Sequence, residues 1–240
     1  MDTVTLFING TKVDAVKGMS ILEAARKAEI YIPSLCHHPD LPPSQRTKAV
    51  DHVYRGSEKV VGDSLEKEFE GCNLCLVEIG GQQELVPSCD TPMADNMKVF
   101  TDTKQVKDAR QEKLMLILAK HPHACLLCAQ KEGCTRDTCP TNVPVAERCC
   151  QKFGNCELEK VAEYVGIRAD TPRYVPKNLP IVTEEPLFTR DYNLCISCTR
   201  CVRACQDLRG VEALGFTYLN GEAVVGPVAV SYTHLTLPTK

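Results

Sequence analysis

Cysteine is the residue that most constrains what this chain can fold into. The chain has 240 residues, of which 15 are cysteine and none is tryptophan. The cysteines fall into three groups in successive segments, which predicts three small metal-binding modules in series. The groups are Cys36, Cys72, Cys75 and Cys89, then the seven cysteines from Cys125 to Cys156, then Cys195, Cys198, Cys201 and Cys205.

Composition and charge exclude several classes of protein. The N-terminal residues show no basic stretch followed by an apolar block, so no secretory signal is predicted. We therefore expect a reducing, cytoplasmic environment, where disulfides are rare and clustered cysteines bind metal, and not a disulfide-rich secreted protein. No apolar run reaches the roughly 18 residues of a membrane helix. A net charge of -3 without basic stripes argues against a nucleic-acid partner.

The N-terminal segment predicts a strand, a turn, a second strand and a helix. Val4–Ile8 and Lys12–Val16 are the strands, joined by the Asn-Gly turn signal at residues 9–10. Ser20 begins the helix, and Glu23 completes a capping box. The buried face of the helix is expected to comprise Ile21, Leu22 and Ala25.

The first cysteine group carries a specific resemblance. Cys72 and Cys75 form a tight CxxC that leads into a strand-like Leu76–Ile79, and four thiolates suit a [2Fe–2S] cluster. "IPSLCHHPDL" followed by "GCNLCLVEIGGQQELVPSCDTPMADNMKV" resembles the N-terminal ferredoxin domain of the large iron–sulfur subunit of NADH dehydrogenase (respiratory complex I). Iron-only hydrogenases, NAD-linked formate dehydrogenases and flavin-containing NAD(P)H oxidoreductases begin alike. The resemblance implies a β-grasp fold over residues 1–100 and the cluster ligands Cys36, Cys72, Cys75 and Cys89.

One departure from that family lies between the first two of these cysteines. Thirty-five residues separate Cys36 from Cys72, a longer gap than the family usually has. We therefore expect residues 42–69 to be a polar insertion. If the insertion moved Cys36 away from the other three cysteines, the cluster would lose a ligand.

The second group comes after a predicted helix, Lys104–Lys120, whose buried face is expected to comprise Val106, Ala109, Leu116 and Ile117. The pattern HxxxCxxCxxxxxC comes next and resembles the site of a [4Fe–4S] cluster in the same family. The resemblance implies one imidazole and three thiolate ligands within a small helical domain, residues 101–168. An imidazole in place of a thiolate removes one negative charge and should raise the reduction potential. The implied ligands are His121, Cys125, Cys128 and Cys134.

The third cysteine ligand of this cluster is open. "FGNCELEKVAEYVGI" around Cys156 also resembles the segment at that ligand in the family, which would make residues 134–150 an insertion. Either Cys134 or Cys156 completes the site, and in the second case the inserted cysteines hold another metal. Cys139, Cys149 and Cys150 are candidates for such an extra site, or are ordinary buried thiols.

The third group is a CxxCxxCxxxC run, typical of bacterial ferredoxins. Cys195, Cys198 and Cys201 are predicted to hold a [4Fe–4S] cluster, and Cys205 a further one. No second run comes after it, so the module, residues 187–240, is half of a ferredoxin domain and the total is one to three [4Fe–4S] clusters. The proline-rich residues 169–186 predict an extended linker. The final "VSYTHLTLPTK" breaks the pattern and is interpreted as a read-through artefact of a truncated gene.

The predicted fold class is α+β, with a β-grasp domain, a helical cluster domain and a truncated bacterial-ferredoxin-like domain. The expected function is single-electron transfer within an NAD(P)H-linked oxidoreductase, without a substrate site in this chain, since no GxGxxG or P-loop is present. Expected partners are flavin- or NAD(P)H-binding, hydrogenase or molybdopterin subunits, which could bring the chain to a membrane peripherally. The alternative function is a zinc-binding interaction module.

Overall fold

The computed structural model describes residues 3–42, 47–63, 67–132, 134, 138–183 and 189–229. It divides into two compact units, each built from two stretches of sequence. The first unit comprises Met1–Leu35 and Cys72–Pro176, and the second comprises Cys36–Gly71 and Lys177–Lys240. The predicted read-through end, residues 230–240, lies outside the described residues.

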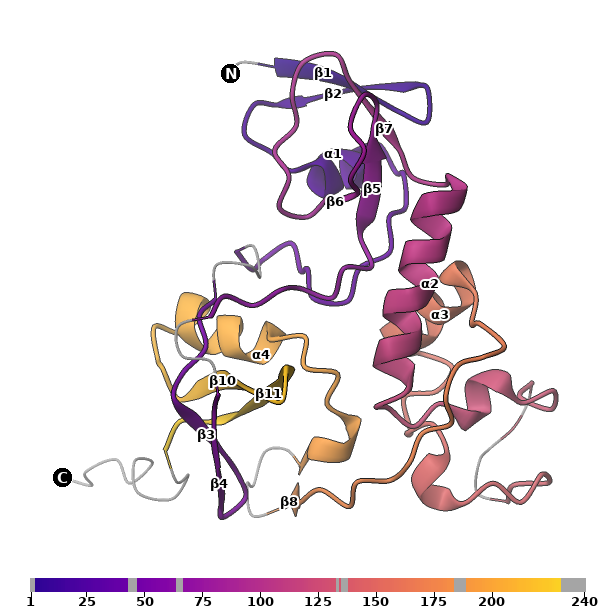
Figure 1. Cartoon of the computed structure of the whole chain (residues 1–240), viewed down its shortest axis with the longest axis vertical. Helices are drawn as coiled ribbons and strands as arrows, with labels where there is room; N and C mark the ends of the chain where they lie inside the picture. Colours follow the sequence, from indigo (N-terminus) through magenta and orange to yellow (C-terminus); the bar gives the residue numbers. More distant parts are fainter. Residues whose placement is uncertain are drawn as a thin grey trace. The chain divides into compact units, whose positions relative to one another are not determined.

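The first unit contains a five-stranded sheet in the order β2-β1-β7-β5-β6 (Figure 1). β1 pairs antiparallel with β2 and parallel with β7. Helix α1 (Ile21–Lys27) covers one face, because its apolar residues share a core with those of the strands. The predicted α+β class is confirmed here. The strands are β1 (Thr3–Ile8), β2 (Thr11–Val16), β5 (Leu76–Ile79), β6 (Val86–Pro87) and β7 (Met97–Phe100).

Local sequence signals determine the N-terminal hairpin and helix. Asn9 and Gly10 both have positive φ angles, 50° and 83°, as a mirror-image two-residue turn requires. The Ser20 hydroxyl accepts a hydrogen bond from the Glu23 amide, and the Glu23 carboxylate accepts one from the Ser20 amide at 2.7 Å. Both predictions are confirmed. So is the buried face of α1, which comprises Ile21, Leu22, Ala24 and Ala25.

The helical part of the first unit consists of α2 (Lys104–Leu118) and α3 (Glu157–Val165), which pack together. The predicted helix is confirmed, and its predicted buried face is right for Val106 but wrong for Leu116. Leu116 is 48% exposed, whereas Val106, Arg110, Leu114 and Leu118 are buried. These four recur every fourth residue, and the pattern is hidden in the sequence because one of them is an arginine.

Arg110 fixes α2 against the sheet. Its side chain donates to the Leu76 carbonyl from Nε (3.1 Å) and Nη2 (2.7 Å), and to the Thr101 carbonyl from Nη1 (2.9 Å). Burial lowers the pKa of the guanidinium, and Tyr164 and Cys75 oppose that shift. Leu76 is the residue directly after Cys75, so the arginine holds the strand that leaves the CxxC.

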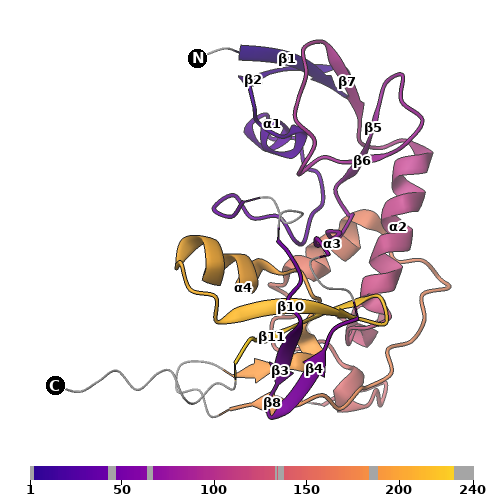
Figure 2. The same ribbon diagram turned by 60° about the vertical axis from the view of Figure 1, so that its left-hand side comes forward.

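The second unit combines hairpins from its two stretches of sequence. β3 and β4 come from the predicted insertion, and β10 and β11 form a hairpin after the last cysteine. The short helix α4 (Arg200–Arg203) continues into a wider turn at Ala204–Leu208. Figure 2 shows β3 crossing close to β10 and β11. The strands are β3 (His52–Arg55), β4 (Glu58–Val61), β8 (Ile181–Val182), β9 (Arg190–Asp191), β10 (Leu214–Leu219) and β11 (Glu222–Pro227).

The predicted insertion is a structural part of this second unit. The Val50 amide donates to the Phe216 carbonyl and the Asp63 amide to the Tyr218 carbonyl, both at 2.8 Å. Phe69 meets Phe216 edge to face at 5.6 Å. A small core of Val53, Val60 and Val224 joins the two hairpins. The segment is therefore not merely a polar excursion of the first domain.

The predicted proline-rich linker has little regular secondary structure in its described part. Residues 171–180 have no helix or strand, and β8 then pairs with β9. Residues 184–186 of the predicted linker lie outside the described part. Short 3₁₀ turns complete the fold at Ala124–Leu127, Val145–Glu147 and Tyr192–Leu194.

Replacing Arg110 should destabilise the first unit. We expect Arg110→Met to lower the free energy of unfolding by about 3 kcal/mol, because two buried carbonyls lose charge-assisted donors. Urea unfolding of the anaerobically prepared chain, followed by far-UV circular dichroism, measures this change. Lys107→Met, on the exposed face of the same helix, is the matched control. Equal stability of both variants would contradict the role given to Arg110.

Candidate metal centres

Two residues with left-handed backbone shape the CxxC loop. Gly71 and Asn73 have φ angles of 79° and 53°, which lets the chain reverse sharply around Cys72. Cys75 ends the loop at the start of β5 and is buried. The loop therefore presents two thiols from a few consecutive residues.

Strand pairing brings Cys89 to the same end of the sheet. Leu76 lies opposite Pro87 in the β5–β6 pair, and the Ser88 amide donates to the Cys75 carbonyl at 3.1 Å. The Leu35 amide also donates to Cys72 Sγ at 3.5 Å. The first unit thus holds three of the predicted [2Fe–2S] ligands. Cys36, the next residue after Leu35, starts the second unit, and its place as fourth ligand stays a prediction.

Within the second unit, Cys36 is buried beside α4. Arg203 donates to the carbonyls of Cys36 and Pro42, and Arg200 donates to the carbonyl of His37 at 2.6 Å. Arg203 is fully buried. Burial lowers its pKa, and the thiols of Cys36 and Cys198 oppose that shift.

These arginines are spacer residues of the CxxCxxCxxxC run. Ser197 and Thr199 adopt positive φ angles of 55° and 56°, and the Ser197 amide donates to Cys195 Sγ at 3.4 Å. Burial raises the pKa of Cys198. Although Cys201 is exposed as a whole residue, desolvation of its thiol raises its pKa to about 11, with Cys198 and Cys195 adding to the shift.

Cys205 lies apart from this arrangement. Its thiol donates to the Val211 carbonyl at 2.8 Å. Cys195 and Cys198 thus both raise the pKa of the Cys201 thiol, while Cys205 has a backbone partner. The assignment of Cys205 to a further cluster stays a prediction.

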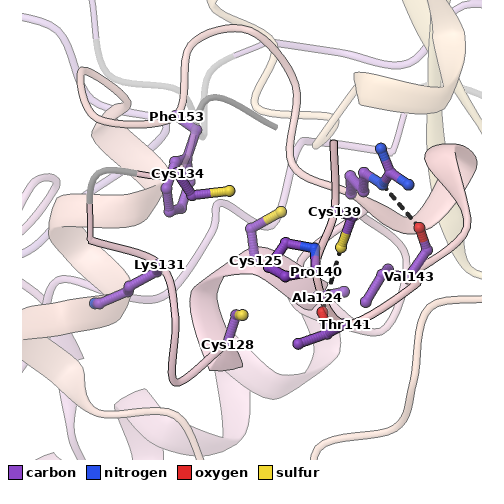
Figure 3. A pocket seen from close by; sticks show the side chains of 11 residues that line it. Ala124, Cys125, Cys128, Lys131, Cys134, Cys139, Pro140, Thr141, Val143 and Phe153 are labelled. Carbon is purple, nitrogen blue, oxygen red and sulfur yellow. Dashed lines mark hydrogen bonds between the residues drawn. The ribbon is translucent and has the colours of Figure 1, made fainter. Parts of the chain in front are cut away.

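The middle segment contains two pockets that divide the candidate ligands. In Figure 3 the side chains of Cys125, Cys128, Cys134 and Cys139 surround the first pocket, together with Lys131. The second pocket is lined by His121, Cys149, Cys150 and Cys156. The structure therefore does not place His121 in the pocket that holds Cys125, Cys128 and Cys134.

Hydrogen bonds and burial affect the protonation of several side chains that line these pockets. His121 Nδ1 lies 2.9 Å from the Pro122 carbonyl, which favours a proton on that nitrogen, and burial lowers the pKa of the ring. The Thr141 hydroxyl, 3.2 Å away, lowers the pKa of Cys139. Burial, with Cys125 nearby, raises the pKa of Cys149 to about 12. Thiols with raised pKa values stay protonated near pH 7 until a metal displaces the proton.

The donor set fits iron–sulfur clusters. All fifteen cysteines are thiols, and thiolates are the usual ligands of such clusters. In the described part of the chain, no three His, Cys, Asp or Glu side chains are grouped closely enough to hold a single metal ion. Over the same residues, no helix is long and apolar enough to cross a membrane.

Sequence reasoning missed the arginines of these sites. Arg110 has the polarity expected of an exposed helix face, and Arg200 and Arg203 occupy the spacer positions of the cysteine run. Two signals could have indicated them. Arg200 and Arg203 lie within the cysteine run, and Arg110 lies at four-residue spacing from buried apolar residues. Their backbone partners could be found only from the structure.

Comparison with protein families matches two of the three predicted modules. Residues 1–49 and 64–104 match a 2Fe-2S iron–sulfur cluster binding domain. Residues 185–232 match the ferredoxin-like domain of NADH-quinone oxidoreductase subunit 3. The gap in the first match, residues 50–63, contains the β3–β4 hairpin that packs in the second unit. The predicted [2Fe–2S] and [4Fe–4S] cofactors are confirmed by these matches.

The relatives have the names of hydrogenase, oxidoreductase and dehydrogenase proteins. The NADP-reducing hydrogenase subunit HndD of Solidesulfovibrio fructosivorans is 31% identical over 95% of this chain and 32% of its own length. The NADH-ubiquinone oxidoreductase 75 kDa subunit of Reclinomonas americana is 29% identical over 88% of this chain and 24% of its own. The putative formate dehydrogenase YrhE of Bacillus subtilis is 26% identical over 90% and 17%. The chain thus spans about a third or less of these relatives.

A solved structure shares the fold. An NAD⁺-reducing [NiFe]-hydrogenase in its H₂-reduced state superposes with a TM-score of 0.63 and 23% identity, covering 94% of this chain and 75% of that one. These comparisons confirm the resemblance seen in the motifs: the chain is similar to subunits of NADH dehydrogenases and of an NADP-reducing hydrogenase, and to a formate dehydrogenase.

Proposed function

We propose that this chain relays single electrons between redox partners through iron–sulfur clusters held by its three cysteine groups. The observation that carries the proposal is the arrangement of cluster-type domains at both ends of the chain, with a middle segment whose thiols and imidazole line two pockets. When bound, such clusters supply one-electron transfer. The chain itself holds them, sets their charge and shields them from water.

The proposed ligands correspond to the cysteine groups. Cys36, Cys72, Cys75 and Cys89 hold the [2Fe–2S] cluster. Cys195, Cys198 and Cys201 hold a [4Fe–4S] cluster, and Cys205 reaches a further one. The hydrogen bond from the Leu35 amide to Cys72 Sγ supports the first set, because an amide donor to a ligand sulfur offsets its negative charge. The Ser197 amide supports the last set in the same way.

Buried arginines position the cysteine loops. Arg203 donates to the Cys36 and Pro42 carbonyls, and Arg110 to the Leu76 carbonyl. Each guanidinium brings a positive charge close to thiol groups, which stabilises the anionic forms of those thiols. We propose that these arginines help to set the reduction potentials of the neighbouring sites.

The proposed partners are other redox subunits or domains that bind flavin or NAD(P)H, or that carry hydrogenase or molybdopterin chemistry. The names of the relatives, which include an NADP-reducing hydrogenase and a formate dehydrogenase, support this range. The abundance of thiols supports a reducing, cytoplasmic location. The physiological reaction would then belong to the whole assembly.

Elemental analysis tests the proposal against a zinc scaffold. We expect the anaerobically purified chain to contain iron and acid-labile sulfide in near-equal amounts, and dithionite to produce both [2Fe–2S] and [4Fe–4S] EPR signals. The sample for this test is protein that was assembled anaerobically with iron supplied. Stoichiometric zinc without sulfide would contradict electron transfer and favour an interaction module.

Alanine substitution tests the fourth ligand of the [2Fe–2S] site. We expect Cys36→Ala to abolish the [2Fe–2S] signal, to lower the iron content by about two per chain and to leave the [4Fe–4S] signals. Cys205→Ala, which removes a thiol from another group, should keep the [2Fe–2S] signal. A full [2Fe–2S] signal in Cys36→Ala, with circular dichroism unchanged, would show that another residue is the ligand.

A further inference from the structure

Thr199 has a hydroxyl group for which the fold provides no partner. The residue lies between the second and third cysteines of the CxxCxxCxxxC run, and only 1% of its surface is exposed. Its hydroxyl oxygen is buried and has no hydrogen-bond partner among the described residues. A buried polar group that is left unpaired destabilises the folded chain. The residue therefore needs an explanation.

The backbone at Thr199 adds a second cost. Its φ of 56° and ψ of 6° lie in the left-handed region, which β-branched residues rarely adopt and which suits glycine. A threonine that precedes a helix often caps it by accepting a hydrogen bond from an amide of the first turn, but Thr199 makes no such bond to α4. Neither backbone conformation nor capping accounts for a threonine at this position.

Ser197 shows how the same loop satisfies a hydroxyl when it can. Its backbone is also left-handed, with a φ of 55°, and its hydroxyl donates to the Ala223 carbonyl at 2.6 Å. The loop thus contains two hydroxyl side chains on similar backbone, of which one has a protein partner. The hydroxyl of Thr199 is the one that remains available to a group bound by the chain.

Backbone amides before and after Thr199 donate to cysteine sulfurs. The Ser197 amide donates to Cys195 Sγ at 3.4 Å. Burial raises the pKa of Cys198, and a hydrogen bond from the Arg200 amide opposes that shift. Thr199 is therefore part of a loop whose other donors already serve the sulfurs of the predicted ligands. Hydrogen bonds to the sulfurs are among the factors that set the reduction potential of an iron–sulfur cluster.

We propose that the Thr199 hydroxyl donates a hydrogen bond to a sulfur of the [4Fe–4S] cluster held by the CxxCxxCxxxC run, and so raises the reduction potential of that cluster. Negatively charged sulfurs supply the acceptor that the chain alone does not. Reduction adds one negative charge, so the bond stabilises the reduced state more than the oxidised state. This inference rests on the proposed electron-transfer function and assigns a potential-setting residue to one of its centres.

Two substitutions that differ by one oxygen atom test this bond. Thr199→Ser and Thr199→Ala both remove the β-branch, and only the first keeps the hydroxyl. The sample is the full chain, prepared anaerobically with ferrous iron and sulfide and titrated potentiometrically with EPR detection. We expect Thr199→Ser to keep the midpoint potential of the unmodified chain. Thr199→Ala should change the reduction equilibrium about tenfold, which lowers the midpoint potential of a one-electron couple by about 59 mV. The signal of this cluster is the one that Cys198→Ala removes.

Thr217 on β10 provides a matched control outside the cysteine run. It is also fully buried, and its hydroxyl also has no hydrogen-bond partner among the described residues. This hydroxyl lies against Gly62 of the inserted segment, where an added Cβ would collide with it. Thr217→Ser and Thr217→Ala should therefore give equal midpoint potentials for the same cluster.

Other results would overturn the inference. Equal midpoint potentials in Thr199→Ser and Thr199→Ala, or a difference of the same size between the two Thr217 variants, would show that the Thr199 hydroxyl does not bond to the cluster. If Thr199→Ala assembles too little cluster, Thr199→Gly, which suits the left-handed backbone, takes its place in the comparison. Either contradiction would leave the proposed function standing, whereas absence of acid-labile sulfide from the unmodified chain would remove the function itself.

Discussion

Each compact unit depends on one buried guanidinium that joins a helix to the backbone beside a cysteine. Arg110 on α2 donates to the carbonyl after Cys75, and Arg203 on α4 donates to the carbonyl of Cys36. The carbonyls that these arginines bind lie beside cysteines, and a buried carbonyl left unpaired is costly. A side chain with five donors supplies those bonds and adds positive charge beside the thiols.

Local chemistry made much of the fold predictable. The Asn-Gly turn, the Ser20 capping box and strand β5 depend on neighbouring residues, and the structure has them at the predicted positions. The predicted buried face of α2 is only partly right, because a buried arginine has the polarity of a surface residue. The packing of residues 50–63 on β10 and β11 depends on partners more than 150 residues away, and no local pattern encodes it.

The candidate sites were predictable to the level of cysteine groups. Spacing indicates which thiols are close along the chain, as with Cys195, Cys198 and Cys201. It does not reveal which thiols share a pocket when several lie on one irregular segment. In the middle segment, Cys134 and Cys139 line one pocket and His121 and Cys156 line another, and no spacing along the chain gives that division.

Electron transfer in single steps is the central claim, and a potentiometric titration of the anaerobic chain followed by EPR tests it most directly. We expect the [2Fe–2S] and [4Fe–4S] signals to rise and fall reversibly, each along a one-electron Nernst curve, in the same chain. Metal centres that give no reversible signal over the range typical of such clusters, about -700 to +450 mV, would contradict the claim.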